Sequence, residues 1–439
     1  MSRPHQIAVP LAASPAEVCG NLRRTHPVSL LLDGTGGAGH AWEIGPLVAV
    51  DPVRAAYTDR ELSDGLAVLD RLVAERRAAG GTAETGVAAL LAYELFSDPR
   101  RTDPTPARLV VLTVDGSVRI REGGEALLSA RNTSQIDPLR RRLDDLEQTP
   151  REPATPVRRV GAPTTSLPRT AYLKAVERVK HHIAEGDIYQ ANLCQRFSVA
   201  CEGDPFAAYV KMTAATPAPR SAFVEAPEFA LVSISPETFL QLNRNGVVET
   251  RPIKGTRPRG ATPAEDDAAA ASLMGSEKDH AELLMIVDLE RNDLSRICRA
   301  GSVEVPELAA LQSYPAVHHL VARVRGRLVT DVGVRDLLRA TFPGGSITGA
   351  PKIRAMEILR ELEPVPRGFF TGSLFWFGDD GTLDSSILIR SWVFSGGRGW
   401  LGAGGGIVAD SEPDAEWQES NHKARALTEA VGFDPEEAG

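Results

Sequence analysis

Apolar positions in the first part of the chain form short runs that are separated by a helical pattern. The runs Val28–Leu32, Leu47–Val50 and Leu109–Val114 have the length and composition of buried strands. Between them, the apolar residues of Leu62–Ala78 recur at helical spacing, which predicts an amphipathic helix. We therefore expect an N-terminal region, residues 1–148, that mixes strands and helices.

Segments with a recognisable helix or strand pattern become more frequent after residue 169. A helix is predicted from Arg169 to Glu185, because one face is apolar and Gly186 follows as a stop. The next stretch, DIYQANLCQRFSVA, alternates like a strand and places Gln190, Asn192 and Cys194 on one face.

Further elements follow in the same region. A β-hairpin is predicted over Thr238–Thr256, with its turn at Asn245-Gly246. A helix from Glu277 to about Arg299 is predicted to start with a capping box, in which Ser276 precedes Asp279 by three residues. The stretch SSILIRSWVF is predicted as one strand, which leads through GAGGG into a last helix near Pro413–Ala430.

These elements define the expected organisation. Strands in tandem hairpins and separated helices indicate an α+β fold with large antiparallel sheets, not a βαβ arrangement. Residues 149–169, TPREPATPVRRVGAPTTSLPR, are rich in Pro, Thr and Arg and are predicted to be a surface linker. This linker separates residues 1–148 from a larger region, residues 170–432.

Composition narrows the class of protein. The chain has 439 residues, 42% of them hydrophobic and 24% charged, as in an ordinary globular protein. Its formal charge of −9 argues against nucleic-acid binding, which requires basic surfaces. The four cysteines form no CxxC pair, and zinc is not expected. The sequence has neither a signal-peptide pattern nor a run of ~18 apolar residues, so a cytoplasmic protein without a membrane span is expected.

Two pairs of acidic residues have the same spacing on two predicted helices. Asp279 and Glu282 are three residues apart, as are Glu416 and Glu419, so each pair shares a helix face. If the four carboxylates converge, they need a divalent cation such as Mg²⁺, which binds a few carboxylates together with water and substrate oxygens. On spacing alone, two solvated helix faces are the simpler explanation, because such pairs are common.

A carboxylic acid and an amine flank the predicted hairpin. Glu237 precedes it and Lys254 lies on its return strand, so the two side chains are candidates for an acid and a nucleophile in one cleft. A lysine amine becomes nucleophilic near neutral pH only if burial or a nearby cation lowers its pKa from ~10.4. Lys254 is otherwise one more basic residue beside Arg251 and Arg257.

Glycines and one arginine are candidates for anion binding. In GAGGG (402–406) backbone N–H groups can approach an anion, and Arg390 can bind a carboxylate with two parallel hydrogen bonds, although a glycine run is often only a turn. GGSITGAPK (344–352) lacks the Lys-Ser/Thr of a phosphate loop. None of the cysteines lies in a Gly-x-Cys-x-Gly context, so the chain has no evident glutaminase nucleophile.

Taken in order, these segments resemble the chorismate-binding enzymes, which include the anthranilate, aminodeoxychorismate, isochorismate and salicylate synthases. The resemblance extends from about Tyr172 to Leu427, and the segment TGVAALLAYELF adds a fainter likeness in the N-terminal region. The matching motifs are GDIYQANLCQRF, SISPETFL, RPIKGTRPRG, EKDHAELLMIVDLERNDLSRI, VHHLVARVRG, TFPGGSITGAPKIRAMEIL, ILIRSWVF and GAGGGIVADSEPDAEWQESNHKA.

The resemblance implies a fold and a set of roles. It implies a four-layer α/β/β/α fold with the active site between two packed, mainly antiparallel sheets, and an N-terminal region packed closely on the catalytic part. It implies Mg²⁺ ligands at Glu282 and Glu419, which Asp279 and Glu416 support, and a general acid at Glu237. Residues that contact chorismate are implied at Gln190, Thr256, His319, Arg390, Gly404, Gly405, Gly406 and Lys423.

Two positions distinguish the reactions within the family. Members that add water to chorismate carry a lysine base where this chain has Gln190, and an amide cannot take a proton from water. At the position of Lys254, anthranilate synthases typically carry alanine, whereas aminodeoxychorismate synthases typically carry lysine. The resemblance is therefore closest to the large component of aminodeoxychorismate synthase, which aminates chorismate at C4 with ammonia from a separate glutaminase.

Anthranilate synthase component I is the alternative, and a non-catalytic homologue is a further one that the intact acid, metal and substrate positions disfavour. The chain also departs from the family pattern in places. Phe370 stands where many relatives have tyrosine. The two segments that bind tryptophan in relatives are altered here to Leu31-Leu32-Asp33-Gly34 and to residues 215–220, which end in Arg220, so tryptophan binding is not expected.

Overall fold

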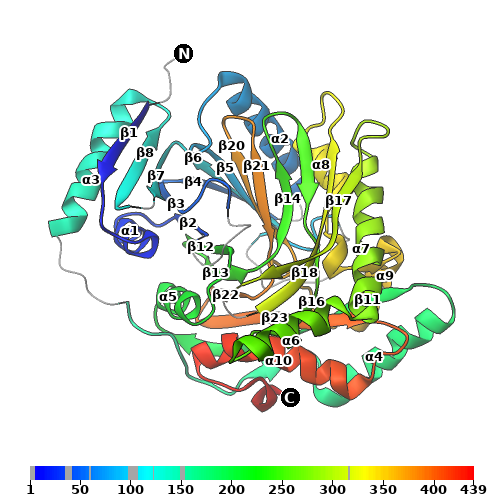
Figure 1. Ribbon diagram of the computed structural model, residues 1–439. Helices are drawn as coiled ribbons and strands as arrows, with labels where there is room; N and C mark the ends of the chain where they lie inside the picture. Colours follow the sequence, from blue (N-terminus) through cyan, green and yellow to red (C-terminus); the bar gives the residue numbers. More distant parts are fainter. Residues whose placement is uncertain are drawn as a thin grey trace.

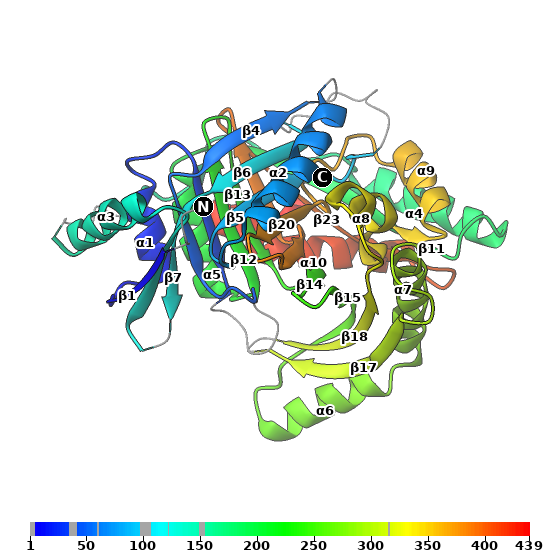
Figure 2. The same cartoon turned by 90° about the horizontal axis from the view of Figure 1, so that it is seen from above.

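The computed structural model of this chain contains two large antiparallel sheets that face each other (Figures 1 and 2). It describes residues 5–34, 42–58, 61–96, 107–121, 123–148, 154–314 and 317–439. All strand pairings among these residues are antiparallel, as the hairpin-rich sequence predicts.

The first sheet contains 13 strands among the described residues. From edge to edge it runs through β1 (His5–Pro10), β8 (Glu125–Ala130), β7 (Gly116–Arg121), β3 (Leu47–Val50), β2 (Ser29–Asp33), β12 (Arg220–Ala226), β13 (Phe229–Ser235), β22 (Ser391–Ser395), β23 (Arg398–Ile407), β11 (Gln190–Glu202) and β10 (Thr164–Thr165), with β9 (Arg158–Arg159) and β19 (Gly349–Ala350) also paired to β11.

The second sheet has ten strands in the same described ranges. Its order is β16 (Ile253–Pro258), β18 (Val317–Arg327), β15 (Val247–Thr250), β14 (Thr238–Leu242), β21 (Leu383–Ile387), β20 (Ser373–Gly378), β5 (Gly86–Leu91), β6 (Leu109–Val114) and β4 (Val53–Tyr57), with β17 (Glu304–Ser313) also paired to β18.

Helices cover the outer faces of both sheets, and this gives the four-layer α/β/β/α arrangement (Figure 1). They are α1 (Pro15–Leu22), α2 (Leu62–Ala79), α3 (Ile136–Gln148), α4 (Arg169–Ala184), α5 (Pro205–Ala215), α6 (Pro263–Met274), α7 (Glu277–Ser295), α8 (Val334–Thr341), α9 (Lys352–Leu362) and α10 (Pro413–Val431). None of the described helices combines the length and apolar character needed to cross a bilayer.

An apolar layer between the sheets holds them together. Leu30 of β2, Leu90 of β5 and Trp376 of β20 are at most 1% exposed in this layer. Each such side chain contributes roughly 1.5–3 kcal/mol through its removal from water. The N-terminal strands are integral to both sheets, because β2 pairs with β12 and β5 pairs with β20. The expected close packing of residues 1–148 on the remainder therefore takes the form of shared sheets.

The segment predicted as one strand, SSILIRSWVF, is two strands in different sheets. Its first part belongs to β21 of the second sheet and its last part is β22 of the first sheet. The chain crosses between the sheets at Leu388–Arg390, where Arg390 has a φ of +51°. The prediction was wrong because alternation of apolar and polar residues does not show where a strand changes sheets.

The predicted hairpin is shorter than expected. β14 and β15 form it, and its turn contains Gly246 with a φ of +73°. The chain then breaks at Arg251-Pro252, and Lys254 lies on β16, which pairs with β18 instead of β14. Proline has no N–H group for a continuous ladder.

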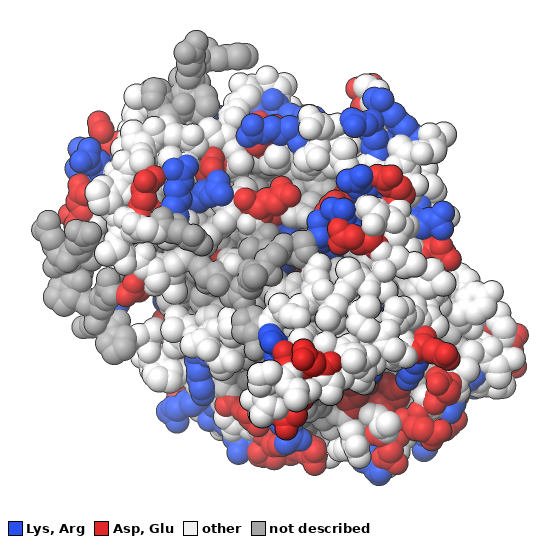
Figure 3. All heavy atoms as spheres, in the orientation of Figure 1, with Lys and Arg blue, Asp and Glu red and all other residues white. Residues whose placement is uncertain are grey.

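Other boundaries also differ from the predictions. The described part of the predicted linker, residues 154–169, includes the short strands β9 and β10, while 149–153 lie outside the described residues. Helix α7 starts as predicted, because the Ser276 side chain accepts a hydrogen bond from Asp279 N, but the helix ends at Ser295. The Asp279 carboxylate binds Arg257 and does not complete a capping box. On the face seen in Figure 3, basic and acidic side chains of the described residues are interspersed without a broad basic stripe.

Candidate active site

The predicted site residues meet where the ends of the two sheets approach each other. Gly406 shows this directly, because a methyl group on its α-carbon would lie 2.1 Å from Gln190 Nε2 and 3.4 Å from Lys254 Nζ. Gln190 starts β11 of the first sheet and Lys254 lies on β16 of the second. A glycine at position 406 is therefore required for the close approach of these side chains.

Lys254 is an enclosed amine that faces acids. Its side chain is only 13% exposed, and its Nζ lies 3.8 Å from Glu282 Oε2. Burial lowers the pKa of Lys254, and the charge of Lys423 acts in the same direction. The carboxylates of Glu282, Glu237 and Glu419 oppose this shift. A lowered pKa increases the fraction of free amine that can act as a nucleophile.

Glu237 is a buried acid near Lys254. It is 5% exposed, and burial raises its pKa to about 7, although Ser346 and the charge of Lys254 offset part of this rise. Its Oε1 atom has no hydrogen-bond partner among the described residues. A carboxyl group with this pKa is suited to donate a proton near neutral pH.

The four predicted carboxylates come together from α7 and α10. Burial raises the pKa of Glu282, and the charges of Asp279 and Glu419 add to the rise. Burial and the charge of Glu419 likewise raise the pKa of Glu416. These effects act between α7 and α10, and a methyl group on Gly405 would lie 3.3 Å from Glu416 Oε2 and 3.5 Å from Glu419 Oε1.

Each carboxylate also has its own partner. Asp279 binds Arg257 at 3.0 Å and Glu416 accepts a hydrogen bond from Ser411 Oγ at 2.6 Å. Glu419 forms an ion pair with Lys423 at 2.6 Å; although burial opposes its ionisation, this pair lowers its pKa.

The donor atoms of this group fit a hard divalent cation. Asp279, Glu282, Glu416 and Glu419 offer carboxylate oxygens only, and a cation would offset their mutual repulsion and the burial of Glu282 and Glu416. Within the described residues, the one acidic or histidine trio with ligand atoms within 4.8 Å of one another is His182, Glu185 and Asp187. No three of the four carboxylates therefore approach one another as closely as this trio does, and a Mg²⁺ ion held by them would need water and substrate oxygens as further ligands.

Thr256 and His319 lie side by side across β16 and β18. Thr256 Oγ1 and His319 Nδ1 are 2.9 Å apart. Burial lowers the pKa of His319 to about 4, with a contribution from the charge of Arg390. The imidazole is therefore neutral at physiological pH, and the Tyr314 ring packs against it edge-on at 5.6 Å.

Arg390 and the glycine strand provide groups for an anion. No hydrogen bond or ion pair joins the Arg390 guanidinium to the described part of the chain, and burial lowers its pKa. β22 pairs with β23 only as far as Leu401. Along Gly402–Ile407 one edge of β23 therefore has no neighbouring strand among the described elements, which leaves backbone groups for a ligand. Lys423 lies at the same strand and donates a hydrogen bond from Nζ to Gly404 O at 3.1 Å.

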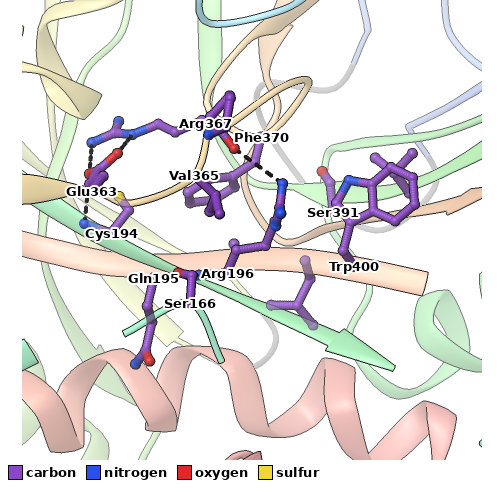
Figure 4. Close-up of a pocket in the computed structure, with 14 residues that line it drawn as sticks. Ser166, Cys194, Gln195, Arg196, Glu363, Val365, Arg367, Phe370, Ser391 and Trp400 are labelled. Carbon is purple, nitrogen blue, oxygen red and sulfur yellow. Dashed lines mark hydrogen bonds and ion pairs between the residues drawn. The ribbon is translucent and has the colours of Figure 1, made fainter. Parts of the chain in front are cut away.

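A small pocket adjoins the glycine strand (Figure 4). The Phe370 ring occupies the space that a side chain at Gly402 would need, since a methyl group there would lie 2.1 Å from the ring. Glu363 lies behind it, binds Arg367 and accepts a hydrogen bond from Cys194 N. In place of a hydroxyl, Phe370 supplies apolar packing at this edge of the site.

Three groups near the site were not predicted. Glu290 and Ser346 are buried close to Glu237, and the charge of Lys278 reaches Glu282, Glu416 and Glu419. A signal existed for Glu290, because it is an acidic residue on a helix face that also carries the buried Ile286 and Val287.

The segment 215–220, which departs from the tryptophan-binding pattern of relatives, contributes a buried ion pair. Arg220 is fully buried, binds Asp384 and lies with its guanidinium 5.1 Å from the centre of the Trp42 ring.

The sequence matches the family described as chorismate binding enzyme over residues 37–429. It is 48% identical over 262 residues to aminodeoxychorismate synthase component 1 of Klebsiella aerogenes, covering 60% of this chain and 58% of that protein. It is 43% identical over 268 residues to anthranilate synthase component 1 of Geobacillus stearothermophilus, covering 61% and 53%. The chain thus matches little more than half the length of these relatives.

A solved structure extends the likeness to most of the fold. Anthranilate synthase component I of Streptococcus pneumoniae superposes with a TM-score of 0.74 at 26% identity, over 87% of this chain and 91% of that one. The family match covers most of the sequence. This chain belongs to the chorismate binding enzyme family.

Proposed function

We propose that this chain is an aminodeoxychorismate synthase component that converts chorismate and ammonia into 4-amino-4-deoxychorismate. The observation that carries the proposal is the Lys254 amine, which lies 3.8 Å from Glu282 and shares an enclosed space with Gln190 and Gly406. The similarity to aminodeoxychorismate synthase component 1 of Klebsiella aerogenes supports it.

Lys254 provides a route to amination at C4. Its amine attacks C2, the double bond shifts, and the C4–O bond breaks while Glu237 donates a proton to the departing oxygen, which leaves as water. Ammonia then attacks C4, the double bond shifts back, and the lysine amine leaves C2. The proton that ammonia loses balances the proton that left with water.

Other groups bind and orient the substrate. Arg390, the free edge of β23 and Lys423 bind the enolpyruvyl carboxylate, and Thr256 and neutral His319 line the ring. Glu282 and Glu419 would hold Mg²⁺, with Asp279 and Glu416 in support, and the bound ion supplies positive charge for the ring carboxylate. Gln190 is 1% exposed and carries no basic group, which supports amination over addition of water.

Ammonia comes from a separate glutaminase in this proposal. The name "component 1" of the relatives implies a second component for those proteins. In this chain all four cysteines are free and buried, and burial raises each thiol pKa, which is unsuited to a glutaminase nucleophile.

The test is product identification by chromatography and mass spectrometry after incubation with chorismate, Mg²⁺ and ammonium. The expected product is 4-amino-4-deoxychorismate, which an added lyase converts into 4-aminobenzoate. Fluorescent anthranilate would instead establish the alternative, amination at C2. Binding of chorismate without turnover would identify a non-catalytic homologue.

A further inference from the structure

Two buried carboxyl groups meet at one turn behind the site. Glu237 lies just before β14 and Glu290 lies in α7, and each is 5% exposed. The turn Gly345–Ile347 touches both of them. A methyl group on Gly345 would lie 3.4 Å from Glu290 Cγ, and the next residue, Ser346, interacts with the Glu237 carboxyl.

Polar atoms in this place lack partners. Glu237 Oε1 and Glu290 Oε2 are buried and form no hydrogen bond with the described residues. Buried oxygen atoms are normally hydrogen-bonded, so two unpartnered carboxyl oxygens at one turn require an explanation. A proton on one or both carboxyl groups lowers the cost of leaving these oxygen atoms without a donor, because the neutral form is less strongly solvated than a carboxylate.

The surrounding charges do not neutralise Glu290. Lys352 is the cation that acts on it, but its ammonium already binds Asp293 and the carbonyl oxygens of Thr341 and Pro343. The charge of Asp293 also acts on Glu290, and Lys254 is the cation that acts on Glu237. The carboxyl pair therefore lies where two negative charges are unfavourable.

The pKa values of the pair agree with this geometry. Burial raises the pKa of Glu290 to about 8, the charge of Glu237 adds to the rise, and a hydrogen bond with Thr250 offsets part of it. Glu237 has a pKa of about 7, which burial raises in the same way. Two such coupled groups lose their protons as a pair, in two steps.

We propose that Glu290 is a positioning residue that shares a proton with Glu237 and keeps Glu237 in its acid form above neutral pH. The inference rests on the proposed function, in which Glu237 protonates the departing C4 oxygen. When Glu237 has given up its proton, the proton of Glu290 moves to Glu237, and Glu290 becomes the carboxylate. The proton released by the incoming ammonia restores the pair, so no net proton is gained or lost.

The first test is the pH profile of the E290Q variant, measured with ammonium at a constant concentration of free ammonia. Gln keeps the size of the side chain but cannot supply a proton. The alkaline limb of kcat is expected to move down by about one pH unit, from the second ionisation of the pair towards the first. D288N is the matched control, because Asp288 is an exposed acid on the same helix. The alkaline limb of its kcat profile should not move. An unchanged limb in E290Q would overturn the proposal.

The second test needs no turnover. Infrared titration of the protonated carboxyl bands in the wild-type chain and in E237Q follows Glu290 at equilibrium. Because the charge of Glu237 raises the pKa of Glu290, its midpoint is expected to fall in E237Q. Equal midpoints would refute the coupling even if E290Q failed to fold. Absence of ammonium-dependent turnover in the wild-type chain would refute the proposed function, while the titration would still decide the coupling.

Discussion

At the residue scale, the proposed reaction depends on Lys254 for the choice of the carbon that is aminated. Replacing it with Ala removes the only nucleophile proposed for C2, so C4 amination is expected to fall by at least about 10²-fold. The K174A variant is the control, because Lys174 is an exposed lysine on α4. Ammonium-dependent formation of 4-amino-4-deoxychorismate, followed by mass spectrometry, measures the effect. Unchanged turnover in K254A would refute a covalent role for the amine.

Glu237 is the proton donor of the proposed reaction at the same scale. Because burial raises its pKa to about 7, it is protonated below that pH and loses this form as the pH rises. E237Q is expected to lower kcat by about 10²–10⁴-fold, the usual contribution of a general acid. The melting temperature checks that the variant is folded. A variant that kept its wild-type kcat would exclude Glu237 as the acid.

The residues of the site were predictable to different degrees. The carboxylate pairs and Lys254 could be named from spacing, but their roles came from the resemblance of the motifs. Glu290 and Ser346 were missed because their importance depends on a contact between α7 and the turn Gly345–Ile347, which are some 50 residues apart in sequence. No local pattern records such a contact.

At the scale of elements, the glycines of β23 leave room for side chains from both sheets to meet at the candidate site. In G406A the new methyl group would lie 2.1 Å from Gln190 Nε2 and would displace Gln190 from Lys254. We expect turnover to fall at least about tenfold, a loss of roughly 1.4 kcal/mol or more in transition-state stabilisation. G116A is the control, since the nearest atom to its methyl group is 3.9 Å away. Equal kinetics in both variants would show that Gly406 does not position these side chains.

Elements that depend on local signals were predicted well. α2, α4 and α7 start within a residue of their predicted positions, because apolar periodicity marks all three and the Ser276 cap also marks α7. The crossing at Arg390 was missed, because β21 and β22 read as one continuous strand and only their partners in different sheets separate them. This crossing places Arg390 between the sheets, so the missed feature is also a functional one.

At the scale of the whole molecule, the proposed function requires an acidic chain to bind a dianionic substrate. The formal charge is −9, and the carboxylates of α7 and α10 make the site itself acidic. Mg²⁺ with chorismate is therefore expected to raise the melting temperature of the wild-type chain, because ligands that bind only the folded state stabilise it. The E282Q and E419Q variants should show a smaller rise, and D288N should behave like the wild type. Equal shifts in all four proteins would exclude these carboxylates as ligands.

The buried carboxyl pair also predicts how the stability of the whole fold depends on pH. The pKa of Glu290 is about 8 in the folded chain, against ~4.3 for an unfolded Glu, so the folded state binds more protons between these values. Stability from this group is complete below about pH 4 and is lost as the pH rises towards 8. E290Q cannot ionise and escapes this loss. Its melting temperature relative to the wild type is therefore expected to increase between pH 5 and pH 8.5, by about 2 °C or more. D288N, which replaces an exposed acid, should show no such trend, and a constant difference for E290Q across this range would mean that Glu290 is ionised in the folded protein.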